Sequence, residues 1–523
     1  MLKDYINNHP LKSILILAMF LRIIAVFLSG GFMMFDDHFL LVEIPHAWTV
    51  DYDYDFWLPH PNSPSGKEGP AGFSLFYPGF QYLYFEICSF LNITNPQIIM
   101  WINRLLHAIF SLFTIYYAYK IAEKLGNKKT AFTVGLLLST LAIFPNMSVR
   151  TLVEMVGIPF VMCGIYFQIK ALDSNKRYQY IFWGAFILGI SFSVRFQNAL
   201  FLAGVGLYYL LKKEWKNATL FALGGFSSML LFQLPDVFIF GEWFAELKAY
   251  VDYNNTHKYD FLQGGAFKYI GVILVACGVP ISIAMLFGFF RYPKKYLILF
   301  LPGFLFLAFH SYFPNKQERF ILPAVPLILT NGILAWNYFE SKSKFWLKNL
   351  KLHKGLWIFF WVTNTLLLAL MTTHYTKRAR VKAAEYVYNT QEQVDFILIE
   401  ESDRKVATRI PLFYMGQYPK YVNIVKASKK APSESGKLLQ AQGQEFFRMK
   451  TKPFYTGDKI EVGIPNYVFI VGEKNIDLRL EALKKAYPNL QLVYTAEPSF
   501  MDSIFQKNKR NNNRPIYVYK NIK

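Results

Sequence analysis

The chain has 523 residues, of which 53% are apolar, 18% are aromatic and only 17% are charged. Soluble proteins carry charge on roughly a quarter of their residues, so this composition excludes an ordinary soluble protein, a disordered chain and a coiled coil. The net charge is +21, but the lysines and arginines separate long apolar runs. That pattern is typical of a multi-pass membrane protein and argues against nucleic acid as a partner.

Long apolar runs predict the membrane spans, because a helix needs about 20 apolar residues to cross the bilayer core. The first run is not expected to be a cleaved signal peptide, since Arg22 lies in its middle and no A-x-A-like cleavage site follows. Eleven spans are predicted, at 12–32, 98–118, 130–144, 151–169, 179–194, 196–211, 217–235, 267–290, 296–312, 320–338 and 355–373.

The distribution of cations predicts the orientation of these spans. Before the last span, the loops on one side hold twenty lysines and arginines, and those on the other side hold eight. Cytoplasmic loops are the more positive ones, so the N-terminus is expected in the cytoplasm and the loop 33–97 outside. The apolar stretch 72–92 is interpreted as an interfacial segment, because a twelfth span there would reverse all later loops.

Residues 375–523 differ from the rest and are expected to form a soluble α/β domain outside the membrane. Their apolar runs are only of strand length, and a helix with one apolar face is predicted at 478–488. The segment 507–514 is expected to be a polar loop. Strands are predicted at 394–400, 466–472, 491–497 and 515–520. The predicted architecture is therefore an α-helical multi-pass membrane domain at 1–374 followed by this small domain.

Two adjacent acids, Asp36 and Asp37, follow the first span at its outer end. A carboxylate beside the membrane can act as the general base for a sugar hydroxyl, and the simpler interpretation is a solvated start of the loop. Adjacent acids would also suit a divalent metal ion, although nothing in the sequence requires a metal or another cofactor.

A second group of charges, Lys316, Glu318 and Arg319, lies at an outer mouth between two spans. These charges could form an interfacial ion-pair cluster, or the two cations could hold a phosphate. Arg195 lies where a long apolar run must break into two helices, and an ionisable residue at such a break marks a candidate site. Further candidate cations on the outer face are Arg104 and Arg150, and Arg22 either pairs within the helix bundle or reaches the same site.

Four segments stand in order along the chain: FDDHFLLVEIPHAW (35–48), SVRTLVEMVG (148–157), PDVFIFGEW (235–243) and NKQERFILPAVPLIL (315–329). Together they resemble segments of glycosyltransferase family 22, the lipid-linked mannosyltransferases of N-glycan and GPI-anchor assembly. The first segment is similar to the family's first-loop pattern Pro-Asp-Glu-x-Phe-Gln followed by Glu and His. The second is similar to its Arg-Thr segment with a downstream acid. The third, with the blocks after it, resembles its second outer-loop block, and the fourth resembles its His-Lys-Glu-x-Arg-Phe motif.

The resemblance covers about residues 12–340 and has departures. Asn315 and Gln317 replace the family's His and Glu, while Phe35 and Leu40 replace its Pro and Gln. These changes bear on the sugar and the acceptor more than on the class of reaction.

The resemblance implies a GT-C glycosyltransferase, a hexosyltransferase that moves a sugar, mannose by family, from a polyprenyl phosphate to a glycan or glycolipid with inversion. Asp36 would be the base and Asp37 its helper, or the reverse. Lys316 and Arg319 would bind the donor phosphate, with Arg150, Arg195 and Arg104 as further candidates. Residues expected to bind the substrates are Glu43, His46, Asp236 and Glu318.

Two other classes of protein remain open at this point. A polyprenyl-linked sugar transporter or flippase would also need cations near lipid phosphates, but it would not need a base in the first outer loop. A membrane anchor for the C-terminal domain gives no reason for ordered motifs on one face. The richness in Lys, Asn, Ile, Phe and Tyr is typical of an AT-rich bacterial genome, which predicts an inner-membrane protein with its active face in the periplasm, or in the endoplasmic reticulum if the source is eukaryotic.

Overall fold

The computed structural model describes residues 2–50, 69–404, 407–426, 438–441, 444–449, 463–505 and 513–522. The chain forms two compact units. The helical unit contains Met1–Ser29, Gly69–Phe80 and Trp101–Thr373, and the sheet unit contains Gly30–Glu68, Gln81–Met100 and His374–Lys523. The C-terminal part of the sheet unit begins at His374, next to the domain boundary that the sequence suggests. Most of the loop 33–97, however, belongs to the same unit as the C-terminal residues.

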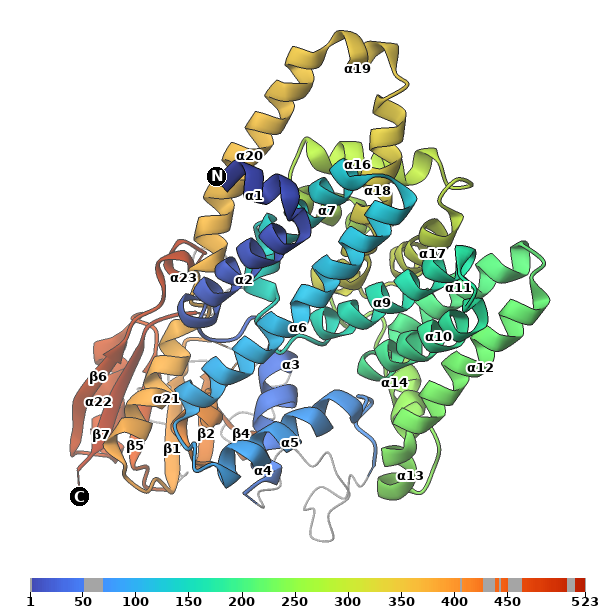
Figure 1. Ribbon diagram of the computed structural model, residues 1–523. Coiled ribbons are helices and arrows are strands. Elements are labelled where there is room, and N and C mark those ends of the chain that lie inside the picture. Colours follow the sequence, from blue (N-terminus) through green and yellow to red (C-terminus); the bar gives the residue numbers. More distant parts are fainter. Residues whose placement is uncertain are drawn as a thin grey trace. The chain divides into compact units, whose positions relative to one another are not determined.

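The helical unit is built almost entirely from α-helices joined by short loops (Figure 1). Its elements are α1 (Leu2–Asn8), α2 (Pro10–Leu28), α6 (Pro96–Leu125, shared with the sheet unit), α7 (Lys128–Thr140), α8 (Ile143–Met147), α9 (Val153–Lys170), η2 (Ala171–Asp173), α10 (Arg177–Val194), η3 (Phe196–Asn198), α11 (Ala199–Leu211), α12 (Trp215–Phe232), α13 (Leu234–Phe240), α14 (Ala245–Thr256), α15 (Lys268–Cys277), α16 (Ile281–Arg291), α17 (Leu297–Tyr312), η4 (Glu318–Ala324), α18 (Val325–Glu340), α19 (Lys344–Lys348) and α20 (Leu350–Thr372).

Within the described residues, six helices are long and apolar enough to cross a membrane, and four shorter apolar helices accompany them. The six are Pro10–Leu28, Pro96–Leu125, Val153–Ala171, Trp215–Phe240, Glu318–Glu340 and Leu350–Thr372. The eleven predicted spans are largely helical, but two of them are clearly not one continuous helix: 130–144, which breaks between α7 and α8, and the run 267–290. The run 267–290 divides into α15 and α16 because Gly278 takes φ +74° and Pro280 has no N–H to donate to a helix.

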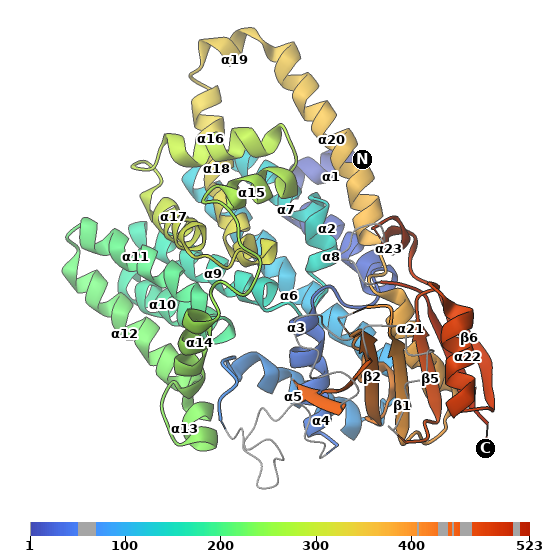
Figure 2. The ribbon, with the colours of Figure 1, turned by 180° about the vertical axis from the view of Figure 1, so that it is seen from behind.

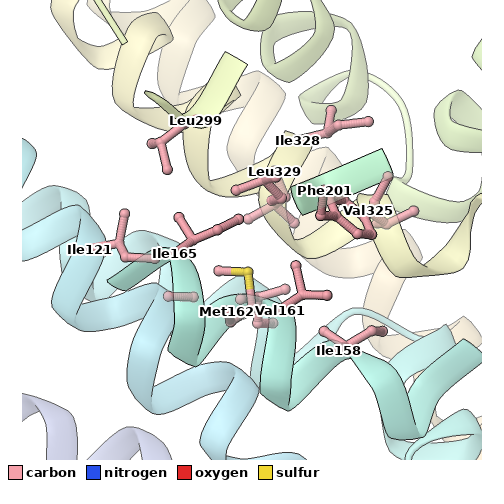
Figure 3. Packing of buried hydrophobic residues seen from close by; sticks show 14 of the residues in the cluster. Ile121, Ile158, Val161, Met162, Ile165, Phe201, Leu299, Val325, Ile328 and Leu329 are labelled. Atoms are coloured by element: carbon pink, nitrogen blue, oxygen red, sulfur yellow. The ribbon is translucent and has the colours of Figure 1, made fainter. Parts of the chain in front are cut away.

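The core of the helical unit lies around α9 and α18. Figure 3 shows side chains of α6, α9, α11, α17 and α18 converging there, among them Ile121, Met162, Phe201, Leu299 and Leu329. In its apolar window the run Glu318–Glu340, which comprises η4 and α18, has 89% of its residues buried, whereas α20 has 22%. The outer helices therefore keep exposed apolar faces, as helices in contact with lipid do.

The stretch 72–92 forms α5 (Phe76–Phe90), whose 15 residues are too few to cross a bilayer. One face of this helix buries Phe85 and Cys88, while Phe80 and Ile87 stay exposed. An interfacial position for α5 fits this pattern and stays a prediction.

The sheet unit has a seven-stranded mixed sheet of order β3-β4-β2-β1-β5-β7-β6 (Figure 2). Strand β1 pairs in parallel with β2 and β5, and β7 pairs antiparallel with β5 and β6. Its elements are α3 (Phe35–His38), the π-helix η1 (Phe39–Glu43), α4 (Ile44–Trp48), α21 (Arg378–Thr390), β1 (Phe396–Glu401), η5 (Leu412–Met415), β2 (Lys420–Lys426), β3 (Leu438–Ala441), β4 (Gln444–Met449), β5 (Tyr467–Val471), α22 (Ile476–Ala486), β6 (Leu490–Ala496), α23 (Phe500–Phe505) and β7 (Ile516–Asn521).

The four predicted strands and the predicted helix of the C-terminal domain are confirmed as β1, β5, β6, β7 and α22. Alternate residues of neighbouring strands, such as Leu398, Ile424 and Ile470, pack against Leu483 of α22. The sequence analysis missed α21, β2–β4 and α23. Residues 507–512 of the predicted polar loop and 51–68 of the predicted outer loop lie outside the described residues.

Candidate active site

Three charged side chains from separate elements of the helical unit meet in its interior. Glu154 lies in the first turn of α9, Arg195 ends α10 with an extended backbone, and Arg319 lies in η4. The Glu154 Oε1 atom is 2.6 Å from Nη1 of Arg195 and 3.6 Å from Nε of Arg319. These residues, called the Glu154 cluster below, expose 0%, 9% and 8% of their side chains.

The surroundings of the Glu154 cluster favour an additional anion. The ring of Phe320 lies 5.0 Å from the guanidinium carbon of Arg195 and 5.6 Å from that of Arg319. Gln317 Oε1 accepts a hydrogen bond of 3.1 Å from Arg319 Nε. Arg195 Nε is buried and has no hydrogen-bond partner among the residues described. The buried Nε donor of Arg195 could give an oxygen anion a charge-assisted hydrogen bond.

Lys316, predicted to bind phosphate, has main-chain partners. Its Nζ atom donates hydrogen bonds to the carbonyls of Ser311 (2.7 Å) and Phe313 (2.6 Å), at the C-terminal end of α17. A cation there offsets the partial negative charge of a helix end. Burial lowers the pKa of the Lys316 ammonium, and the positive charge of Lys268 lowers it further.

Glu318 also has a partner in the protein, because its Oε1 atom lies 2.8 Å from Lys268 Nζ. The pair is partly exposed and therefore contributes little stability. The same ammonium donates to the carbonyl of Lys316 at 2.6 Å, and the hydroxyl of Tyr269 donates to that of Gln317 at 3.1 Å. Residues at the start of α15 thus hold the segment that carries Lys316 and leads into Arg319.

The other predicted arginines lie in or beside the second half of α2. Arg150 Nη2 donates to Ser29 Oγ at 2.8 Å, and Arg104 Nη1 donates to the carbonyl of Val26 at 3.5 Å. Arg22 donates from Nε to Ser111 Oγ at 2.7 Å and from Nη2 to Ser148 Oγ at 3.2 Å. Of the two interpretations of Arg22, the structure supports pairing within the bundle.

Asp236 orders a loop of the helical unit. Its Oδ2 atom accepts the N–H of Glu246 at 3.0 Å, and Glu246 Oε2 in turn accepts the N–H groups of Gly72 at 2.6 Å and Phe73 at 3.0 Å. Gly72 has φ +79°, which is unfavourable for other residues. Glu246 was missed by the sequence analysis, because an acid in a polar helix gives no local signal of burial.

The predicted acids lie in the acid segment, residues 35–48 of the sheet unit. Asp36 and Asp37 occupy the single turn α3; Asp36 is half-buried and Asp37 exposes only 3%. The guanidinium of Arg409 lies over the rings of Phe35 and Phe39, at 5.1 and 4.5 Å, and therefore beside this turn. Arg409 was not predicted, because it lies beyond the region of family resemblance.

Residues from the C-terminal part of the chain hold both ends of α3. Lys377 Nζ donates to the carbonyls of Phe32 (3.2 Å) and Met33, just before α3. At the last residue of α3, His38 stacks between the rings of Phe32 and Tyr414, with centroids 4.6 and 5.5 Å away. The acid pair is thus held by main-chain hydrogen bonds and ring stacking within one compact unit.

Glu43 and His46, predicted to bind substrate, have partners inside the sheet unit. Glu43 Oε1 accepts hydrogen bonds of 3.2 Å from His38 Nε2 and from the N–H of Phe413. The hydroxyl of Tyr418 donates to the carbonyl of Glu43 at 3.2 Å and contacts His46 Nδ1 at 2.8 Å. That hydroxyl has one proton, so His46 must be the donor in the second contact.

Burial lowers the pKa of His46 to about 4, and the nearby charge of Glu43 offsets this only in part. His46 is therefore neutral near pH 7. The contacts of Glu43 and His46 are those expected of residues that hold α3 in place.

Within the described ranges, no group of three or more His, Cys, Asp or Glu side chains is placed to hold a metal ion.

Comparison with known sequences gives one family and several relatives. The Alg9-like mannosyltransferase family matches residues 13–396. Mannosyltransferase APTG1 of Arabidopsis thaliana is 23% identical over 332 residues, which are 61% of this chain and 57% of the relative. GPI mannosyltransferase 4 of Saccharomyces cerevisiae is 25% identical over 284 residues, 51% of this chain and 52% of the relative. The chain thus spans little more than half the length of these relatives.

Solved structures show the same fold at low identity. ArnT from Cupriavidus metallidurans bound to undecaprenyl phosphate has a TM-score of 0.60 and 12% identity, covering 98% of this chain and 97% of that one. The oligosaccharyltransferase of Archaeoglobus fulgidus, tethered with an acceptor peptide, has a TM-score of 0.52 and 12% identity, covering 76% of this chain and 63% of that one. The predicted GT-C fold is confirmed.

Proposed function

Because the chain belongs to the Alg9-like mannosyltransferase family, we propose that it transfers a mannosyl residue from a polyprenyl-phosphate donor to a glycan or glycolipid acceptor. The transfer takes place at the outer face of the membrane and inverts the configuration of the sugar. The names of its relatives support the choice of mannose, and the undecaprenyl phosphate bound to ArnT supports the choice of donor.

The observation that carries this proposal is the Glu154 cluster. When the bond between the sugar C1 and the phosphate oxygen breaks, the lipid phosphate leaves with the electron pair and gains negative charge. Preorganised cations in a site shielded from water stabilise such a charge without having to reorganise. Arg195 supplies the buried Nε donor, and Arg319 supplies a second guanidinium across the same carboxylate.

The other half of the reaction needs a base. The acceptor oxygen attacks C1, and its proton passes to a carboxylate at hydrogen-bond distance. Asp36 is assigned this role because it is the less buried of the two acids, and Asp37 is its helper. Lys316, Glu43, His46, Asp236 and Glu318 act as supports in this scheme, because each contacts another part of the protein.

The test uses the purified full-length chain with polyprenyl-phosphate mannose and a glycolipid acceptor, and follows the mass of the product. Arg195→Ala and Arg319→Ala should each weaken donor use about ten- to a hundredfold, the value of a charge-assisted hydrogen bond. The matched control is Arg177→Ala, because Arg177 pairs with Glu214 in a partly exposed ion pair and should change donor use little.

Two results would contradict the proposal. If the unmodified chain binds the donor but forms no product with any glycolipid, the transporter or flippase alternative is favoured. If Arg195→Ala changes only the apparent affinity for the acceptor, the Glu154 cluster does not hold the donor phosphate.

The outer-face assignment has its own test. Single cysteines at residue 125 and residue 347 should resist a membrane-impermeant thiol reagent in intact cells, while a cysteine at residue 440 should react. Labelling at residue 347 would overturn the predicted orientation.

A further inference from the structure

A groove of about 610 Å³ lies at the end of the helical unit where the chain begins, far along α2 and α6 from their outer ends. It is lined by the last residue of α1, the first half of α2, the last two turns of α6 and the first residue of α7, all in the part of the helical unit near the N-terminus in Figure 1. None of its residues belongs to the Glu154 cluster or the acid segment.

Along the chain into α2, the lining changes from mostly polar at Asn8, His9 and Lys12 to apolar at Leu15, Ile16 and Met19. The polar lining contains Asn8, His9, Lys12, Lys120, Glu123 and Lys128. Three lysines against one glutamate give this polar lining a formal net charge of +2, counted without the histidine. The apolar lining contains Leu11, Leu15, Ile16, Met19 and Tyr119. A ligand that contacts both linings must carry a negative head and a hydrocarbon body.

An exposed apolar stripe continues the groove along α2. Ile16, Phe20, Ile23 and Phe27 are all exposed, and their spacing of four, three and four residues places them on one face of the helix. The stripe begins inside the groove at Ile16. From Ile16 to Phe27 the helix rises about 16 Å, close to half of the roughly 30 Å hydrocarbon core. The stripe therefore matches the depth of one leaflet.

We propose that this groove binds an anionic glycerophospholipid of the leaflet at the lysine-rich end, with the phosphate between the lysines and an acyl chain along the α2 stripe. The positive-inside pattern assigns this end to the cytoplasmic leaflet. The Lys120 Nζ atom lies 2.8 Å from Glu123 Oε2, so this carboxylate competes with the lipid for one of the three cations. The site is independent of the proposed transferase activity.

Binding is measured on the full-length protein by native mass spectrometry after exchange with phosphatidylglycerol or phosphatidylcholine. Each cation near a lipid phosphate is worth about 1 kcal/mol, or about fivefold in affinity. Lys12→Gln together with Lys128→Gln should therefore weaken phosphatidylglycerol retention roughly 25-fold and leave phosphatidylcholine unchanged. The matched control is Lys348→Gln with Lys351→Gln, because these lysines are exposed on the same predicted side.

Glu123→Gln gives the sharper result, because it should raise phosphatidylglycerol retention, about fivefold if Lys120 becomes fully available. Damage to the fold would lower retention instead. Equal retention in the groove variants and in the control variant would overturn the proposal.

Other phosphates provide the remaining arms. If inorganic phosphate displaces phosphatidylglycerol, or if short-chain phosphatidylglycerol binds equally well, the acyl chain does not contribute to binding. Either result would overturn the proposal that the α2 stripe binds an acyl chain. Preferential retention of polyprenyl phosphate would make the groove a carrier-lipid site and overturn the choice of a glycerophospholipid.

Discussion

The Glu154 cluster and the acid segment both hold charged groups away from water, but they do so by different means. In the Glu154 cluster a single carboxylate joins two guanidinium groups from different helices. In the acid segment, α3 is fixed by several separate contacts, including ring stacking on His38, hydrogen bonds from the Lys377 ammonium to main-chain carbonyls, and a main-chain N–H bound by the Glu43 carboxylate. We therefore expect a single substitution in the Glu154 cluster to lower the stability of the protein more than a single substitution in the acid segment.

The largest expected effect separates chemistry from binding. Asp36→Asn keeps the shape of the side chain but cannot accept a proton, so turnover should fall about 10²–10⁴-fold while donor binding persists. Asp37→Asn should lose less. Product formation and donor retention are measured on the same preparations. If only Asp37→Asn is inactive, the two roles exchange; if both variants are active, the general base is not in the acid segment.

The same substitution in both regions tests the comparison directly. Glu154→Gln removes the only carboxylate of the Glu154 cluster and leaves buried guanidinium charges, which should cost about 3–5 kcal/mol of stability. Glu43→Gln retains an oxygen that can accept from His38 and Phe413, and should cost about 1–2 kcal/mol. Thermal unfolding in detergent measures both.

A second change serves as the control for this pair. Adding Arg195→Gln to Glu154→Gln should restore part of the lost stability, because the two residues are coupled. Equal losses for Glu154→Gln and Glu43→Gln would show that the two regions do not differ as described.

The acid segment should also respond to pH through His46. Its pKa of about 4 in the folded protein lies below the ordinary 6.5, so protonation favours the unfolded state. The stabilisation is complete above about pH 6.5 and declines as the pH falls to about 4, by at most about 3 kcal/mol. His46→Phe should flatten the dependence of the unfolding temperature on pH over this window. An unchanged slope in that variant would assign the effect to another group.

The smallest effect is expected from Tyr418→Phe. The change removes the hydroxyl that contacts both Glu43 and His46, at a cost of about 1–2 kcal/mol. Hydrogen exchange should accelerate in residues 35–48, and kcat should fall while the KM for the donor holds. Tyr494→Phe is the control, since its ring stacks on Tyr386 elsewhere in the sheet unit. Equal exchange in both variants would remove Tyr418 from the support of α3.

The elements of this protein could be predicted from its sequence where the signal is local. Apolar runs located the helices, and short apolar runs located β1, β5, β6 and β7. Helix α21 was missed because charged residues interrupt its apolar positions. The run 267–290 was predicted as one span because hydropathy does not register the backbone break at Gly278 and Pro280.

The residues of the candidate site also divide into those that the sequence identifies and those that only the fold brings together. The sequence alone placed Asp36, Asp37, Arg195 and Arg319 among the residues of interest, because charges beside apolar runs are conspicuous. Only the tertiary structure decided that Arg195 joins Glu154, 41 residues away, that Lys316 turns to the end of α17, and that Phe413 and Tyr418 support the acid segment. Hydropathy and propensity depend on neighbours along the chain, whereas a buried charge is stabilised by whichever partner the fold brings within a few ångströms.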